Sequence, residues 1–156
     1  MTDITFGMDP ILGRIAGYLQ QHPNRREIDP LDIGAVLLPH FYILEVLAQS
    51  AAARPRLHVR LVGTALDTAF GRSVRGHDLA DFLHGARSSD VLDGFFKCAT
   101  TRRAIWMRQV VHIGDSPPRY VEGVAVPIIP DLICGGLVFG KITVDSAQAS
   151  FQSRPL

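Results

Sequence analysis

Apolar residues near the start of the chain recur at steps of three and four, which is the spacing of one face of an α-helix. Asp9 is suited to cap this helix, and Pro10 fits its first position because the missing N–H would have no partner there. His22 precedes Pro23 and is therefore disfavoured in a helix. The pattern predicts an amphipathic helix from Pro10 to about His22. Its apolar stripe consists of Met8, Ile11, Leu12, Ile15 and Leu19.

Two β-prone runs follow a crossing segment that is interrupted by prolines. The run FYILEVL is rich in aromatic and branched residues, and RLHVRLVG alternates Leu57, Val59 and Leu61 with polar side chains. Both compositions are typical of strands. The pattern predicts two strands joined by a short stretch rich in alanine.

A group of short helices is predicted next. Thr64 is suited to cap a helix, Asp67 follows three residues later as in a capping box, and Gly71 is suited to end the helix. A second short helix is expected to begin at Asp78. The segment SSDVLDGFFKCATTR predicts a longer helix before the chain returns to strands.

The pattern then changes to three long β-rich segments. They are AIWMRQVVHI, RYVEGVAVPII and GGLVFGKITV, and the connections between them carry Gly, Pro and Asp, as hairpin turns do. Short connections favour an antiparallel meander. The predicted fold class is α+β: an antiparallel five-stranded sheet with helices over one face and an N-terminal amphipathic helix.

This order divides the chain into three parts. Residues 1–40 hold the N-terminal helix and the crossing segment, and residues 41–145 form the sheet domain. Residues 146–156 form a C-terminal tail whose polar stretch, AQASFQSRPL, is expected to fray. We expect no kinase, cyclase or DNA-binding output within the chain.

Composition and charge narrow the function classes. The 156 residues are 47% hydrophobic and 20% charged, as in ordinary globular domains. Sixteen basic residues against 15 acidic ones give a net charge of +1, so no broad field attracts nucleic acid. No signal-peptide pattern is present, and no run approaches the ~20 apolar residues of a membrane span. We therefore expect a cytoplasmic protein that has no membrane span and does not bind nucleic acid.

Residues 60–79 concentrate arginines and glycines, which raises the question of a phosphate-binding loop. Such a loop needs successive backbone N–H groups turned toward one point. Gly63, Gly71 and Gly76 are eight and five residues apart and match neither common phosphate-loop motif. Tolerance of positive φ at a strand end or helix boundary explains each glycine more simply. The structural interpretation is favoured, and Arg72 is then solvated or paired with a carboxylate.

The motifs DPLDI, RLVGTAL, FGR and GHDL, combined with this order of elements, resemble the PAS domain superfamily. The similarity is strongest to the single-domain PAS family found mostly in alphaproteobacteria, and it covers residues 9–145. The resemblance identifies the strand-to-helix block as a structural motif. Its residues are Arg60, Gly63, Thr64, Asp67, Gly71, Arg72, Gly76 and Asp78.

This resemblance implies a sensory or regulatory module and not an enzyme. PAS domains bind a ligand between the sheet and its helices, or they contact proteins through the outer sheet face and the preceding helix. Haem is disfavoured because the long helix, residues 88–102, carries no histidine. Cysteine-linked flavin is disfavoured because Ser73 stands where the reactive cysteine is expected. Zinc is disfavoured because Cys98 and Cys134 match no ligand spacing.

Trp106, Arg108 and His112 share one face of a predicted strand, because even numbers of residues separate them. If that face looks into the helices, the three side chains line a small-molecule pocket. If the alternate positions, such as Ile105 and Met107, form the core, Trp106 and Arg108 decorate an outward surface that a partner could contact. The second interpretation is favoured because the alternate positions are more uniformly apolar.

The N-terminal stripe is the candidate dimer interface. Its residues, Met8 to Leu19, form no sustained heptad pattern, so a long coiled coil is excluded. The stripe can dock on its own sheet or pair with another chain, and the family resemblance favours a homodimer.

These observations predict a stand-alone regulatory module that acts through contact with an unidentified regulatory protein and can also hold a small molecule. One alternative is a small-ligand sensor or carrier without a dedicated partner. Another is a small isomerase- or dehydratase-like enzyme, but no pair among His112, Tyr120, Glu122 and Asp67 is singled out by spacing.

Overall fold

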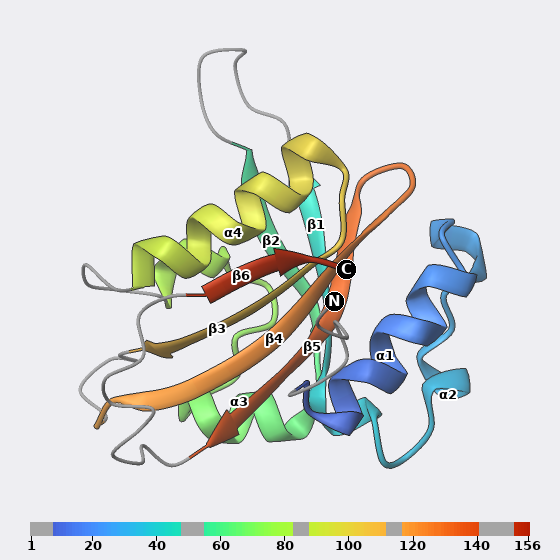
Figure 1. Ribbon diagram of the computed structural model, residues 1–156. Coiled ribbons are helices and arrows are strands. Elements are labelled where there is room, and N and C mark those ends of the chain that lie inside the picture. The colour runs from blue at the N-terminus through green and yellow to red at the C-terminus, as the bar shows by residue number, and fades with distance from the viewer. Residues whose placement is uncertain (1–7, 48–54, 83–87, 112–116, 141–151) are drawn as a thin grey trace.

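The computed structural model describes residues 8–47, 55–82, 88–111, 117–140 and 152–156 (Figure 1). A six-stranded antiparallel sheet runs through the molecule in the order β2-β1-β5-β4-β3-β6. The strands are β1 (Phe41–Leu47), β2 (Arg56–Val62), β3 (Ile105–Val111), β4 (Arg119–Ile128), β5 (Leu132–Gly140) and β6 (Gln152–Pro155). The helices are α1 (Pro10–Gln21), η1 (Arg25–Glu27), α2 (Pro30–Ile33), η2 (Leu38–His40), α3 (Thr64–Phe70), η3 (Leu79–Asp81) and α4 (Ser88–Thr101).

The predicted α+β class and antiparallel sheet are confirmed, but the sheet has six strands where the sequence predicts five. The sixth strand, β6, comes from the polar tail that is expected to fray. It pairs with the free edge of β3, where Arg154 lies opposite Trp106 and Gln152 opposite Arg108. Pro155 is tolerated because an edge strand needs hydrogen bonds on one side alone.

Helices α3 and α4 cover one face of the sheet, as predicted, and the predicted N-terminal amphipathic helix α1 packs against the other face. We call the face packed against α3 and α4 the inner face, and the face packed against α1 the outer face (Figure 1). Phe95 and Cys98 of α4 lie in the inner core with Met107 of β3. Leu12 and Ile15 of α1 lie in the outer core. The sheet is therefore the middle of three layers.

Helix α1 begins where the sequence predicts. The Asp9 carboxylate accepts a hydrogen bond from the Ile11 backbone N–H at 2.8 Å, and Pro10 occupies the first helical position. The stripe faces the chain's own sheet: Leu12, Ile15 and Leu19 are at most 1% exposed. Met8 and Ile11 pack at the edge of the same core.

A β-bulge interrupts the alternation predicted for β2. Ile43 of β1 pairs with Leu61, but the next residue, Leu44, pairs with Val59, so Arg60 is the extra residue. Beyond the bulge the strand reverses its faces. Val59 stays in the inner core, whereas Leu61 turns to the outer face. Because of this bulge, Leu61 lies on the outer face, where it and Arg60 line the pocket described below.

The glycines of residues 60–79 have structural roles, as predicted, but for two different reasons. Gly71 and Gly76 adopt positive φ values of 75° and 86°. Gly63 has a φ of −72° and acts as the N-cap of α3, a position predicted for Thr64. A Cβ atom at Gly63 would lie 2.1 Å from the Leu38 carbonyl oxygen, so close approach of two backbones requires glycine there.

The segment after α3 closes the edge of the sheet at β2. The Val59 N–H donates to the His77 carbonyl at 2.9 Å, and the Gly76 N–H donates to the Val59 carbonyl at 2.8 Å. The Asp78 carboxylate accepts hydrogen bonds from the Arg56 guanidinium at 2.8 and 3.1 Å. The segment thus satisfies backbone groups that would otherwise invite pairing with another chain.

Candidate functional site on the outer face of the sheet

The core enclosed between the sheet and the α3–α4 layer offers almost no room for a ligand. One hollow lies between the sheet and the α3–α4 layer, and its volume is about 20 Å³. Its walls are apolar or aromatic side chains, among them Phe70, Phe82 and Phe95. Small-molecule sites have volumes of ~300 to 1,000 Å³. This hollow is a packing gap and not a preformed ligand site.

Two polar groups inside the inner core differ in how they are satisfied. The Tyr42 hydroxyl donates to the Val124 carbonyl at 2.7 Å, and burial raises the pKa of Tyr42 well above its ordinary value. Gln109 of β3 is 3% exposed, and its Oε1 atom has no hydrogen-bond partner in the described part of the chain. An unpartnered buried acceptor costs free energy, so Gln109 is an anomaly in this core.

Both cysteines are buried. Burial raises the pKa of the Cys98 and Cys134 thiols to about 12. Cys98 donates weakly to the Ala125 carbonyl at 3.7 Å. Both thiols are therefore protonated at neutral pH and are poor nucleophiles.

Trp106 lies on the outer face, as favoured from the sequence, but the prediction that it decorates the surface is wrong. It is 1% exposed and belongs to the core beneath α1. Its Nε1–H donates to Glu122 Oε2 at 2.9 Å, and the same oxygen accepts from the Asp9 backbone N–H at 2.9 Å. Glu122, itself 8% exposed, thereby connects the start of α1 to the sheet.

Two arginines lie over the Trp106 ring. The guanidinium carbon of Arg154 is 4.3 Å from the ring centroid and that of Arg108 is 5.2 Å away. Arg108 Nε also donates to Gln152 Oε1 at 3.1 Å. Neither Trp106 nor Arg108 belongs to the lining of the inner hollow. His112, the third predicted contact residue, lies outside the described residues.

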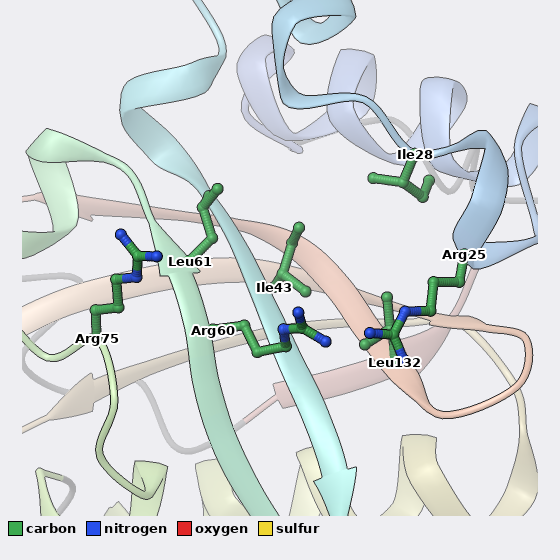
Figure 2. A pocket seen from close by; sticks show the side chains of 7 residues that line it. All are labelled: Arg25, Ile28, Ile43, Arg60, Leu61, Arg75 and Leu132. Atoms are coloured by element: carbon green, nitrogen blue, oxygen red, sulfur yellow. The ribbon is translucent and has the colours of Figure 1, made fainter.

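Part of the outer face remains open beside α1, and it forms what we call the outer pocket (Figure 2). Its volume is about 270 Å³. Figure 2 shows Arg25 and Arg60 reaching toward Leu132 from opposite sides, while Arg75 extends from the loop after α3 beside Leu61. The pocket is lined by Arg25, Ile28, Ile43, Arg60, Leu61, Arg75 and Leu132.

The charges around the outer pocket are partly balanced. Arg25 Nη1 contacts both carboxylate oxygens of Asp131, at 3.1 and 3.2 Å. Arg60 Nη1 donates to Glu45 Oε2 at 2.7 Å. Arg75 is exposed and makes no ion pair within the described residues. Two arginines are held in place by their carboxylates, and the third is available to a partner.

A second hollow lies next to the outer pocket and shares Leu61 with it. Its volume is about 270 Å³, and its walls are mostly apolar, including Pro30, Leu38 and Val62. Leu31 and Val36, in the same part of the chain, are 84% and 62% exposed. Apolar side chains grouped at a surface in this way are typical of protein contact sites.

The sequence alone identifies only some of the residues of the outer pocket. Arg60 is in the predicted structural motif, but as a marker of the fold. Arg25 and Arg75 were not identified, because a single arginine in a loop carries no signal of its spatial neighbours. The bulge at Arg60 could not be read from a strand that appears to alternate regularly.

The described residues contain no group of three or more His, Cys, Asp or Glu side chains that could hold a metal ion. No described helix is long and apolar enough to cross a membrane. What the outer pocket offers is an apolar floor bordered by guanidinium groups, which favours a molecule that is apolar on one side and carries carboxylates on the other.

Comparison with known proteins adds one result. A family model described as PAS domain matches residues 16–110, which is more than half of the chain. The match includes α1 from its second turn, both strands of the β1–β2 hairpin and most of β3. No curated protein matches the sequence.

Proposed function

Because the chain belongs to the PAS domain family, we propose that this sensory or regulatory module passes its signal through contact with a partner protein at the outer pocket. The observation that supports this is the contrast between the two faces of the sheet. The inner hollow holds about 20 Å³, whereas the outer pocket is open and holds about 270 Å³. A surface that is open and charged is available for contact, and a filled core is not.

The partner segment is proposed to be amphipathic and acidic. Its apolar side chains would rest on Ile43 and Leu61 and continue into the neighbouring apolar hollow. Its carboxylates would pair with Arg75. They would also pair with the free N–H groups of Arg25 and Arg60, whose guanidinium groups already contact Asp131 and Glu45 respectively. Arginine and apolar groups together are the usual energetic centre of protein interfaces.

Homodimerisation through the N-terminal stripe stays a prediction. Leu12, Ile15 and Leu19 are buried against the chain's own sheet, so a dimer built on them would require α1 to exchange onto the sheet of a second copy. Such an exchange would break and re-form the Asp9–Glu122 hydrogen bond. A dimer that leaves α1 in place would use other residues.

A second candidate function, ligand sensing in the inner core, is favoured by Gln109. Its orphaned Oε1 is an acceptor that a small donor molecule or a water could satisfy. Native mass spectrometry of freshly purified protein tests this, since a bound molecule would raise the mass above that of the chain. Loss of the added mass in Gln109→Leu would support this candidate.

PAS domains are generally sensory modules and not enzymes, and we extend this to the present chain. Among the candidate catalytic residues, Glu122 is engaged by Trp106 and Asp9, and Asp67 Oδ1 accepts from the Val74 backbone N–H at 3.3 Å. These contacts give both carboxylates a structural role. Turnover of a small carbonyl substrate that is lost in Glu122→Gln would contradict this.

The proposed contact is tested by affinity purification from native cells with quantitative mass spectrometry. Wild-type protein is compared with Arg75→Glu and Ile43→Glu in the pocket, and with Arg14→Glu on the exposed side of α1 as the charge-matched control. We expect at least one protein to be enriched by wild type and Arg14→Glu and lost from both pocket variants. An identical set of proteins from all four would contradict the proposal.

A further inference from the structure

A groove lies between α4 and β6 on the inner side of the sheet, away from the outer pocket. Figure 1 shows the positions of these two elements. The volume of the groove is about 430 Å³, larger than that of the outer pocket, and it falls within the range of small-molecule sites. The wall on one side is the C-terminal half of α4, and on the other it is the edge strand β6. The groove is lined by Gly94, Lys97, Thr101, Arg103, Ile105, Ser153, Arg154 and Pro155.

The charge in this groove is unbalanced. Lys97 and Arg103 both line it and are exposed, and neither makes an ion pair with a carboxylate in the described residues. No acidic residue is among the described residues of its lining. By contrast, the basic side chains of Arg25, Arg56 and Arg60 each have a carboxylate partner. Two like charges beside one hollow repel, and an anion between them removes that repulsion.

The walls of the groove supply neutral contacts as well. The Ser153 hydroxyl makes no hydrogen bond within the described residues and is free to donate to a ligand. The Thr101 hydroxyl donates a hydrogen bond to the Lys97 carbonyl at 2.7 Å, and its oxygen can still accept one from a ligand. Ile105 and Pro155 provide an apolar surface. The lining can therefore hold both a charged end and an apolar end of one molecule.

Gly94 is a further indication of a site. It lies in the middle of α4, where glycine destabilises a helix by ~0.5 to 1 kcal/mol relative to alanine. Gly94 is buried and contributes to the lining of the groove. Local departures from helix preference of this kind concentrate at functional positions.

From these observations we infer that the α4–β6 groove binds a small organic anion with two negative charges, such as a phosphate monoester or a dicarboxylate. Lys97 and Arg103 hold the charged end by charge-assisted hydrogen bonds, and Ile105 and Pro155 contact the apolar end. A macromolecule is not favoured, because the net charge of +1 provides no extended basic surface. The groove shares no residue with the outer pocket, so this inference can be tested independently of the proposed partner contact.

The arrangement also suggests a route for a signal. Arg154 lines the groove from β6, and its guanidinium lies over the Trp106 ring on the outer face. Trp106 binds the Glu122 oxygen that also holds the start of α1. Because the Arg154 guanidinium lies on the opposite face of the sheet from the groove, a ligand would affect Trp106 through a shift of the β6 backbone.

The test is an NMR titration of the full chain at constant ionic strength, with phenyl phosphate and phthalate as the two probes. Amide shifts at Gly94, Lys97 and Ser153 should saturate with at least one probe, and phenol, the uncharged control, should cause none. We expect the double variant Lys97→Gln with Arg103→Gln to weaken binding by about tenfold or more, because it removes both cationic donors of the groove. Arg14→Gln, which removes a charge on the exposed side of α1, is the control and should bind as wild type does.

Several results would overturn the inference. One is the absence of saturable shifts with either probe up to about 10 mM, which corresponds to binding weaker than about 3 kcal/mol. A second is equal binding of phenol, and a third is equal weakening by Arg14→Gln. Binding of a polyglutamate peptide or a single-stranded oligonucleotide at this groove, with neither small probe bound, would also contradict it.

Discussion

The two faces of the sheet are covered in different ways. On the inner face, α3 and α4 close over aromatic and branched side chains and leave a hollow of about 20 Å³. On the outer face, α1 covers β4 and β5, while part of β1 and β2 stays open as the outer pocket. The α3–α4 layer therefore encloses a filled core, whereas α1 covers the other face only in part and leaves the β1–β2 region open to a partner.

The largest expected effect is a loss of stability when one apolar side chain on each face is truncated to alanine. Phe95→Ala should lower the free energy of unfolding by about 3 to 5 kcal/mol, because Phe95 is 2% exposed and packs edge-to-face on Tyr42. Ile43→Ala, in the floor of the outer pocket, should cost less than about 2 kcal/mol because its side chain is partly exposed already. Urea unfolding measures both. Equal losses of unfolding free energy in the two variants would show that the two sites contribute equally to stability.

The next effect concerns the hydrogen bonds that hold α1 on the outer face. Glu122→Leu removes the acceptor of the Trp106 and Asp9 N–H groups, and we expect it to lower the free energy of unfolding by about 2 kcal/mol. Glu122→Gln keeps an acceptor oxygen and should lose clearly less. Hydrogen exchange of the α1 amides should accelerate in Glu122→Leu. Unchanged α1 protection would show that Glu122 does not hold the helix.

A smaller effect of opposite sign is expected on the inner face. Gln109→Met replaces the unpartnered buried amide with an apolar side chain of similar length, and this should raise the free energy of unfolding by about 1 kcal/mol. Thermal and urea unfolding of purified protein measure the change. A destabilisation would mean that Gln109 has a bound partner, and it would support ligand sensing over a closed inner core.

The smallest effect belongs to the edge of the sheet at β2. The Arg56 guanidinium, which donates to the Asp78 carboxylate, holds the pKa of Asp78 below its ordinary value, and His58 contributes in the same direction. A lowered pKa in the folded state means that this stabilisation is complete above pH ~4 and is lost as the pH falls further. Between pH 6 and pH 3, wild type should lose up to about 1 kcal/mol more than Asp78→Asn. Parallel losses in the two proteins would show that the pair contributes nothing.

Much of the fold could be predicted because it rests on local patterns. The cap at Asp9, the stop at Gly71 and the long helix from Ser88 each depend on residues close in sequence. The strand β6 could not be predicted, because its three polar residues and one proline gain their order from β3, a distant part of the chain. Its contacts with Trp106 and Arg108 have no local signal.

The candidate site was less predictable than the fold for the same physical reason. The outer pocket combines Arg25, Arg60 and Arg75, which are far apart in sequence, and it depends on a one-residue bulge that turns Leu61 to the outer face. Trp106 was correctly assigned to a face, but its burial depends on α1 and β6, which its own strand does not specify.

The most direct test of the central claim is site-specific photo-crosslinking in native cells. A photoreactive phenylalanine replaces Leu61 in the outer pocket, and in a control protein it replaces Arg14 on the exposed side of α1. We expect a crosslinked partner from position 61 that is absent from position 14 and is suppressed when Arg75→Glu is added. No crosslink from position 61, or the same product from both positions, would contradict the claim that the signal leaves through the outer pocket.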